Sequence, residues 1–286
     1  MCVFIRLLYM PTQSTIKSVN WHITPRCNYR CRFCFAQNFH DGPVSYDKGL
    51  EILKKLADAG MTKINFAGGE PLLHPRILDY CEEAKNLGMT VSITTNGSRL
   101  NPAKIRKMSG IVDWIGLSID SSLDTIEAEL GRGTGNHVSN CLESAVYLHQ
   151  AGIKLKVNTC VTALTFQENM IPIIRMLNPE RWKVLQMMHI DGENDFARDL
   201  EISPGDFRYF VERHRNVLLE NGTSPVFESA DDMESSYFML TPGGFVKSDA
   251  GRKVTLYSLD EVLKKGIDNF VSEMKYHERG AVYEWS

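Results

Sequence analysis

The stretch Cys27-Asn-Tyr-Arg-Cys-Arg-Phe-Cys34 places three cysteines on one short segment, with three and then two residues between them. Iron–sulfur clusters are held by cysteine thiolates, and three thiolates would leave one iron of a four-iron cluster free for a small molecule. Structural zinc sites usually take two separated pairs of ligands, and no matching second pair follows. The segment therefore predicts a 4Fe-4S site at Cys27, Cys31 and Cys34, with zinc as the alternative. A disulfide is disfavoured because cysteines this close would be strained.

The composition is that of an ordinary globular protein. The chain has 286 residues, 43% of them hydrophobic, and a formal net charge of -3 at pH 7. This length suffices for one large α/β barrel, and the small negative charge argues against nucleic acid as a partner. Seven cysteines without a pairing pattern favour a reducing compartment. We therefore expect a cytoplasmic protein, and a monomer, in which the four cysteines outside the segment are small buried side chains.

The start of the chain, Met1–Met10, is apolar but short, and Arg6 interrupts it. A membrane span needs about 20 apolar residues, and a signal peptide needs a cleavage region that is not evident here. We therefore expect a soluble protein with no stable membrane insertion, in which residues 1–17 form a short N-terminal segment.

Short β-rich runs alternate with amphipathic helical patterns through residues 18–192. Such alternation implies a parallel sheet with right-handed crossovers. Six units predict an α/β fold, a partial (β/α)6 barrel, because the eight units of a full barrel are not found. The expected strands are Ser18–Thr24, Lys63–Ala67, Thr90–Thr95, Trp114–Ile119, Lys154–Val161 and Trp182–Ile190. The expected helices are Ser45–Ala59, Pro75–Leu87, Pro102–Ser109, Asn136–Gln150 and Gln167–Leu177.

The rhythm changes after Gly192, and residues 193–286 are expected to form a C-terminal α/β extension of the same globular unit that closes the barrel. Ser203 is a suitable N-cap for a helix. No cysteine follows Cys160, so we expect a single cluster. The expected elements are a helix at Ser203–Asn221, strands near Val226–Glu228, Ser236–Leu240 and Phe245–Asp249, and a last helix at Ser258–Lys265.

Several motifs fall at the expected carboxyl ends of strands, where α/β folds bind their ligands. The cysteine segment follows the first strand, and Gly68-Gly-Glu-Pro71 follows the second. Glycines let the backbone approach a ligand closely, and the carboxylate of Glu70 could receive an ammonium group; the alternative is a tight turn. Asn96 and Ser118 follow or end the next two strands.

Polar side chains recur two residues apart on four strands, so both members of each pair face one way. Buried cations need anionic partners, and if these faces point inward they form a positive pocket suited to a triphosphate. The alternative is that the cations are solvated at the strand starts. The pairs are Asn20/His22, Lys63/Asn65, Lys156/Asn158 and Arg181/Lys183. A single strand histidine is more often structural than catalytic, so neither His22 nor His189 is assigned as a general acid.

The cysteine segment, with Phe33 before its last cysteine, resembles the signature of the radical S-adenosylmethionine (SAM) enzymes. Further stretches resemble the viperins, the antiviral nucleotide-modifying branch of these enzymes. The resemblance runs from about Ser18 to the C-terminus. The stretches that carry it are Ser18–Thr24, Lys63–Pro71, Gly131–Gly135, Asn178–Val184 and Gly192–Asn194.

This resemblance implies a 4Fe-4S cluster and SAM as cofactors. Gly68, Gly69 and Glu70 would bind the amino group of SAM, and Arg132 would pair with its carboxylate. Asn96 and Ser118 would contact SAM, while Phe33 and Phe35 would shield the cluster and pack near the adenine. Positions that bind the nucleotide in the family match Asn20, Lys63, Asn65, Lys156, Asn158, Arg181 and Lys183. Tyr237 resembles a family tyrosine near the substrate ribose and is the candidate catalytic residue.

The activity that the resemblance implies begins with a 5′-deoxyadenosyl radical, which takes hydrogen from C4′ of a nucleoside triphosphate, with CTP or UTP favoured. Loss of the 3′-hydroxyl as water would give a 3′-deoxy-3′,4′-didehydro nucleotide, an antiviral chain terminator. The expected partner is an electron donor, either a reductase or a flavodoxin or ferredoxin. The alternatives are a radical SAM reaction on a peptide or RNA, and a non-enzymatic iron–sulfur scaffold in antiviral defence.

Overall fold

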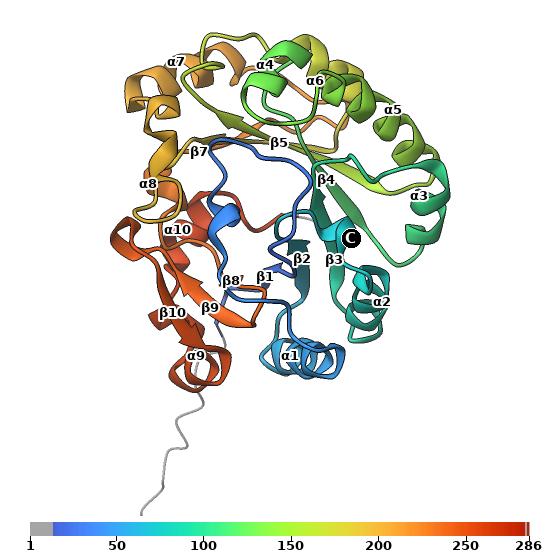
Figure 1. Ribbon diagram of the computed structural model, residues 1–286, viewed down its shortest axis with the longest axis vertical. Coiled ribbons are helices and arrows are strands. Elements are labelled where there is room, and N and C mark those ends of the chain that lie inside the picture. The colour runs from blue at the N-terminus through green and yellow to red at the C-terminus, as the bar shows by residue number, and fades with distance from the viewer. Residues whose placement is uncertain (1–13, 284, 286) are drawn as a thin grey trace, which may run out of the picture.

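A computed structural model describes residues 14–283 and 285. The described strands are β1 (Ser18–His22), β2 (Lys63–Ala67), β3 (Thr90–Thr95), β4 (Trp114–Ser118), β5 (Lys154–Val161), β6 (Arg181–Gln186), β7 (Val226–Glu228), β8 (Met239–Leu240), β9 (Phe245–Ser248) and β10 (Thr255–Ser258). They form one strongly curved sheet in the order β10-β9-β8-β1-β2-β3-β4-β5-β6-β7 (Figure 1). From β8 through β1 to β7 neighbouring strands are parallel, whereas β9 and β10 are antiparallel.

Helices cover the convex side of this sheet. Those between the first six strands are α1 (Tyr46–Asp58), α2 (Ile77–Asn86), α3 (Pro102–Met108), α4 (Asp124–Glu129), α5 (His137–Gln150) and α6 (Ile171–Leu177). Figure 1 shows them along the outer side of the curve. The C-terminal part contributes α7 (Pro204–His214), α8 (Ala230–Met233), α9 (Leu259–Lys265) and α10 (Glu273–Glu278).

Strand β5 shows why the sheet has one apolar and one polar side. Leu155 and Val157 are fully buried in the core beneath the helices. Lys156 and Asn158 alternate with them and face a cavity on the concave side. Because successive side chains of a strand point to opposite faces, the same alternation turns polar side chains inward from the neighbouring strands.

The predicted α/β fold with an incompletely closed parallel barrel is confirmed. The bounds of β2, β3 and β5 are as predicted. Strand β6 stops at Gln186, α6 begins only at Ile171 and α7 ends at His214, so these predicted elements were too long. Helices α4, α8 and α10 and strand β10 were not predicted, because each has only four to six residues and such short runs show no clear period.

The C-terminal part extends the sheet at both edges. Strand β7 pairs with β6, and β8 pairs with β1. The predicted boundary between residues 192 and 193 therefore does not interrupt the sheet. Most of the predicted N-terminal segment, residues 1–13, lies outside the described residues. Among the described residues, no helix has the length and apolar character needed to cross a membrane.

Candidate active site

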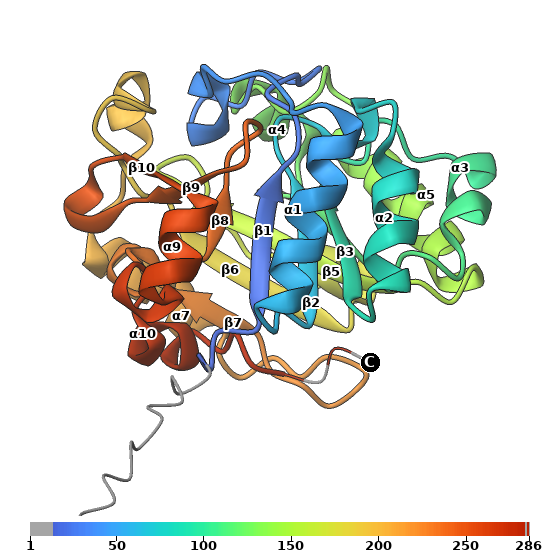
Figure 2. The same ribbon diagram turned by 90° about the horizontal axis from the view of Figure 1, so that it is seen from below.

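A cavity of about 340 Å³ lies on the concave side of the sheet. Its walls come from the inner side of β1–β6, from the cysteine segment after β1 and from residues of the C-terminal part. Figure 2 shows the segment after β1 at the carboxyl ends of the parallel strands, and the segment that follows α10 at their opposite ends. Parallel α/β folds bind ligands at the carboxyl ends, so this cavity is the candidate active site.

The three cysteines predicted to hold a cluster all line this cavity: Cys27, Cys31 and Cys34. Hydrogen bonds from the rest of the protein fix their segment. The backbone N–H groups of Arg30 and Arg32 donate to the turn after α4 at 3.1 and 2.8 Å. The side-chain amide of Asn194 donates to the carbonyl oxygen of Phe33 at 3.1 Å. The segment is therefore shaped by the protein itself.

Gly131 allows the turn after α4 to approach the cysteine segment. Its carbonyl oxygen accepts the hydrogen bond from Arg30, and its φ angle is +80°. A Cβ at this position would overlap the carbonyl oxygen of Arg30. Glycine adopts positive φ without steric cost, so both the conformation and the close approach require it.

The three thiols would have to lose their protons to bind an iron–sulfur cluster. Burial raises the pKa of Cys31 to about 12, and it also raises the pKa values of Cys27 and Cys34. Iron binds thiolates, so binding of a cluster would release these protons. The side-chain amide of Asn96 lies 3.8 Å from the Cys27 sulfur, where its N–H groups can stabilise a thiolate.

The Gly68-Gly69-Glu70 turn is divided between the cavity and the protein interior. Both glycines line the cavity, whereas Glu70 is fully buried outside its lining. The Glu70 carboxylate accepts hydrogen bonds from the Thr95 hydroxyl and from the backbone N–H groups of Leu72 and Asn96, at 2.7 to 3.0 Å. Glu70 therefore ties the turn to the end of β3. This position does not favour the predicted contact of its carboxylate with an ammonium group.

The other residues predicted to contact SAM all line the cavity: Phe33, Phe35, Asn96, Ser118 and Arg132. The Arg132 guanidinium lies 2.7 Å from Asp120 and 3.5 Å from Glu127. Burial and the neighbouring Asp120 charge raise the pKa of Glu127 to about 8. Arg132 thus already has carboxylate partners within the protein, and its pairing with a SAM carboxylate stays a prediction.

Five of the residues predicted to bind the nucleotide line the cavity: Asn20, Asn65, Lys156, Asn158 and Lys183. The Asn65 amide donates to the side-chain oxygen of Asn20 at 2.9 Å, and the Thr94 hydroxyl donates to that of Asn65 at 3.0 Å. These bonds fix the two amides from neighbouring strands. They give this part of the cavity a polar wall.

The remaining two, Lys63 and Arg181, lie at the amino ends of β2 and β6, outside the cavity lining. The ring of Tyr283 covers them, with its centroid 4.2 Å from Lys63 Nζ and 3.8 Å from Arg181 Cζ. Trp285 adds a second ring 4.9 Å from Lys63 Nζ. The four predicted cations therefore divide into two at the cavity wall and two behind it.

The four cations nevertheless act on one another. Burial and the charges of the other three lower the pKa of Lys63 to about 5. Burial, followed by the charges of Lys183 and Arg181, lowers the pKa of Lys156 to about 7. The pKa of Lys183 is lowered to about 8, again chiefly by burial. The positive charges of the group thus exceed the negative charge near it, and an anion in the cavity would restore the charged forms.

Tyr237 lines the cavity beside two charged residues that the sequence did not reveal, Glu228 and Arg279. The Tyr237 hydroxyl donates to Glu228 Oε2, and Lys183 Nζ lies 2.7 Å from Glu228 Oε1. The guanidinium of Arg279 stacks 3.7 Å from the centre of the Tyr237 ring. Glu228 ends a three-residue strand and Arg279 follows a short helix. No periodic pattern could have marked them.

Lys247 and His22 line the cavity near Phe35. Lys247 forms a buried ion pair with Glu193, and its Nζ lies 4.4 Å from the Phe35 ring. Burial and the Lys247 charge lower the pKa of His22 to about 3. Its buried Nδ1 has no hydrogen-bond partner among the described residues. Cys160 also lines the cavity rather than the core; the alternation that turns Lys156 inward could have revealed this.

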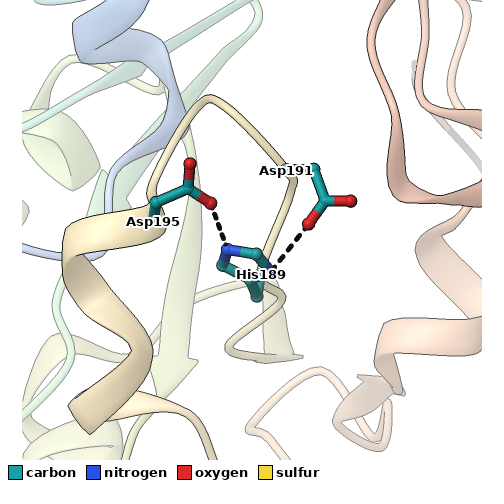
Figure 3. A group of neighbouring side chains, drawn as sticks. All are labelled: His189, Asp191 and Asp195. Atoms are coloured by element: carbon teal, nitrogen blue, oxygen red, sulfur yellow. Dashed lines mark hydrogen bonds and ion pairs between the residues drawn. The ribbon is translucent and has the colours of Figure 1, made fainter.

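His189 lies beside the cavity, although its neighbours Met188 and Ile190 line it. Its Nε2 is 2.7 Å from Asp195 and its Nδ1 is 3.6 Å from Asp191 (Figure 3). These contacts hold the turn after residue 190. The guanidinium of Arg198 lies 3.8 to 3.9 Å from both carboxylates. Because this cation competes with any metal ion, the group is a structural ion-pair network.

Comparison with known proteins gives concordant matches. Residues 21–178 match the Radical SAM superfamily. A protein of Thermoplasmatales archaeon (strain ISO4-H5) named S-adenosylmethionine-dependent nucleotide dehydratase is 36% identical, over 96% of this chain and 100% of its own. A Flammeovirga pacifica protein of the same name is 36% identical, over 94% of this chain and 96% of its own. Danio rerio S-adenosylmethionine-dependent nucleotide dehydratase RSAD2 is 33% identical, over 96% and 79%. Streptococcus suis SuiB bound to S-adenosylmethionine shares the fold, with a TM-score of 0.69 at 16% identity over 92% of this chain and 68% of its own.

Proposed function

This chain belongs to the radical SAM superfamily and, within it, to the S-adenosylmethionine-dependent nucleotide dehydratases, and we propose that it dehydrates the ribose of a nucleoside triphosphate. The predicted resemblance to the viperins is thereby confirmed. The chain is an enzyme acting on a nucleotide, and its superfamily uses a 4Fe-4S cluster and SAM. The proposal adds three details: the length of the substrate's phosphate chain, the identity of its base and the structure of the product.

A group of five cations supports the proposal that the substrate is a triphosphate. We call this group the cation cluster; its members are Lys63, Lys156, Arg181, Lys183 and Arg279. Among the described residues, Glu228 is the carboxylate that forms ion pairs with members of this cluster. Five positive charges and one negative charge leave a net charge of +4 when every group is ionised. A nucleoside triphosphate carries about four negative charges near neutral pH, so the two would balance.

The carboxyl ends of the strands would hold the cluster and SAM. We assign Cys27, Cys31 and Cys34 to three irons, which leaves the fourth iron for the amino and carboxylate groups of SAM. When bound, the reduced cluster supplies the electron that cleaves SAM and yields a 5′-deoxyadenosyl radical. The Gly68-Gly69 turn, Asn96 and Ser118 would position SAM, Arg132 would balance its carboxylate, and Phe33 and Phe35 would exclude water.

The nucleotide would lie between SAM and the cation cluster. Lys156 and Lys183 would bind phosphate oxygens, with Lys63 and Arg181 supplying charge from behind, while Asn20, Asn65 and Asn158 would orient the sugar and phosphates. Tyr237 would lie beside the ribose. Once hydrogen has left C4′, one proton and one electron complete the loss of the 3′-hydroxyl as water. The product would be a 3′-deoxy-3′,4′-didehydro nucleotide, which terminates chain synthesis by a viral polymerase.

Two features of the reaction extend beyond the chain itself. The proposal favours CTP or UTP as the substrate, and it needs an external electron donor, a reductase or a flavodoxin or ferredoxin. The test is an anaerobic assay of the reconstituted protein with SAM, dithionite and each of the four nucleoside triphosphates in turn. Mass spectrometry should show that one nucleotide accelerates release of 5′-deoxyadenosine and gives a product lighter by one water.

Equal, slow release of 5′-deoxyadenosine whatever nucleotide is present would overturn the proposal in favour of another radical SAM reaction, on a peptide or RNA. Binding of labelled SAM with no 5′-deoxyadenosine release at all would favour the non-enzymatic scaffold. Phosphate-free cytidine and uridine are the matched control substrates. They should fail to accelerate the reaction, because they lack the charges that the cation cluster binds.

A further inference from the structure

Glu228 is a buried carboxylate that touches the cavity wall from behind. It ends β7, its side chain is fully buried, and it does not line the cavity. Its two oxygens have different partners: Oε2 accepts the hydrogen bond of Tyr237, and Oε1 lies 2.7 Å from Lys183 Nζ. Lys183 also contacts the Tyr237 hydroxyl. The three side chains therefore form a closed triangle, of which two corners face the cavity.

The surroundings of this triangle are strongly positive. Arg279 Nη1 lies 3.6 Å from Glu228 Oε1, and the guanidinium also donates to the backbone oxygen of Ser236, which holds it over the Tyr237 ring. A lone carboxylate among several buried cations is a costly arrangement to break, because removal of one partner leaves charges unpaired. The charged and titratable groups that act on this triangle from the packed elements are Lys63 on β2, Lys156 on β5, Arg181 and Lys183 on β6, Tyr237 before β8, Arg279 after α10 and Tyr283 in the C-terminal segment.

We propose that Glu228 is a positioning residue of the nucleotide site, whose carboxylate holds the Lys183 ammonium and the Tyr237 hydroxyl at the cavity wall where the nucleotide meets them. This inference rests on the proposed function and assigns a role to a residue that would not touch the substrate. It also explains why a negative charge lies beside a site for an anion. Without Glu228, Lys183 would lie among the four other members of the cation cluster with no carboxylate paired to them among the described residues.

Protonation of Lys183 gives the role a measurable signature. Burial lowers the pKa of Lys183 to about 8 in the free protein, while the charge of Glu228 opposes that shift. Loss of the carboxylate should lower the pKa of Lys183 further, by roughly one to two units for a partner at this distance. A bound triphosphate favours the charged ammonium in either protein. Binding should therefore begin to weaken at a lower pH when Glu228 is neutral.

The test compares Glu228→Gln with wild type in the anaerobically reconstituted full-length protein. Calorimetry without reductant measures the affinity for CTP, or for whichever nucleoside triphosphate wild type binds, from pH 6 to pH 9. Glutamine keeps the size of the side chain and an oxygen that can accept the Tyr237 hydrogen bond. At pH 6 the variant should bind as tightly as wild type or more tightly, because a repelling carboxylate is gone. At pH 8 it should bind roughly tenfold more weakly.

Two further variants separate the roles of charge and packing. Glu228→Asp keeps the carboxylate and should return the pH profile most of the way towards wild type. Tyr237→Phe keeps the Glu228–Lys183 ion pair, so its affinity for the nucleotide should begin to fall at the same pH as that of wild type. Iron content and the thermal melting curve show whether each variant is folded.

The binding profiles distinguish failure of the role of Glu228 from failure of the proposed function. Equal weakening of Glu228→Gln at every pH would show a packing role only and would overturn the inference, as would a profile identical to wild type. A wild-type protein that binds none of the four nucleoside triphosphates would instead overturn the proposed function. Profiles that cross between pH 6 and pH 8, with rescue by aspartate, support the inference.

Discussion

Nucleotide binding should take up protons, and at pH 8 Lys156 should contribute more of this uptake than Lys183, the other lysine of the cation cluster at the cavity wall. In the free protein, burial and the charges of Lys183 and Arg181 lower the pKa of Lys156 to about 7. A triphosphate beside the ammonium would return that pKa towards its ordinary value of about 10.4. Because the pKa is lower in the free protein than in the complex, binding draws protons from solution. The affinity must therefore fall as the pH rises above about 7.

The size of this effect follows from the two lysines at the cavity wall. At pH 8 an amine with a pKa of about 7 is protonated in about one molecule of eleven, so Lys156 would gain roughly 0.9 proton. Lys183, with a pKa lowered to about 8, is half protonated and would gain roughly 0.5. The terminal phosphate has a pKa near 6 and is already ionised. Uptake of roughly 1.4 protons by these two lysines corresponds to a roughly 25-fold fall in affinity per pH unit near pH 8, to which recharging of Lys63 would add.

Lys156→Met removes the charge and keeps the length of the side chain. Calorimetry with CTP and SAM but no reductant, repeated in buffers of different ionisation enthalpy, measures proton uptake directly. Uptake by the variant at pH 8 should be lower than that of wild type by roughly 0.9 proton, the contribution of Lys156. Hydrogen bonds to charged groups contribute about 1.5–3 kcal/mol, so CTP should bind roughly 10- to 150-fold more weakly at pH 7. Iron content should be unchanged.

Lys54→Met is the matched control, because Lys54 is exposed on α1 and pairs only with Asp58 among the described residues. Its proton uptake and affinity should equal those of wild type. A wild-type protein that takes up no protons on nucleotide binding would refute this prediction. Equal proton uptake by Lys156→Met and wild type would also refute it, since Lys156 would then lie away from the phosphates.

Three further changes test other parts of the site. Alanine at Cys27, Cys31 or Cys34 should abolish iron binding and 5′-deoxyadenosine release. Cys160→Ala is the control and should retain both. Loss of iron from this control would place a fourth ligand on β5. Gly131→Ala should lower the iron content and cost about 1–3 kcal/mol of stability. Its control is Gly110→Ala, which also lies at positive φ but has open space around its Cβ, and which should retain the iron. Equal iron content in both variants would contradict the close approach of Gly131 to Arg30. Glu70→Gln weakens three buried hydrogen bonds, so it should cost the iron-free protein about 1–3 kcal/mol of stability and lower its melting temperature. An unchanged melting curve with lost SAM binding would instead make Glu70 a direct ligand contact.

The period of two along the strands made much of the site predictable. It places Lys156 and Asn158 on the side of β5 opposite Leu155 and Val157, and the structure shows this arrangement. Local sequence also revealed the cysteine segment, because its three cysteines lie within eight residues of one another. These features depend on contacts between near neighbours in the chain or on the rule of alternation.

The features that could not be predicted depend on segments distant in sequence. Glu228 and Tyr283 contact the cation cluster, and Arg279 belongs to it; all three come from short elements or from an irregular C-terminal segment. Their neighbours in sequence carry no periodic signal, so only the folded chain shows which cations they contact. Glu70 differs for another reason: its motif was found, but the donors at the end of β3 that occupy its carboxylate come from 25 and 26 residues further along the chain.

The hydrogen bonds that hold the cysteine segment need no iron. They come from the backbone of Arg30 and Arg32 and from the amide of Asn194. We therefore expect the segment to lose most of its conformational freedom when the chain folds, before metal arrives. Zinc fingers, which fold only around their ion, are the opposite case. Synthesis and metallation of this enzyme become separate stages, so a cell short of iron would keep a reserve of finished acceptor protein rather than unfolded chains exposed to proteolysis.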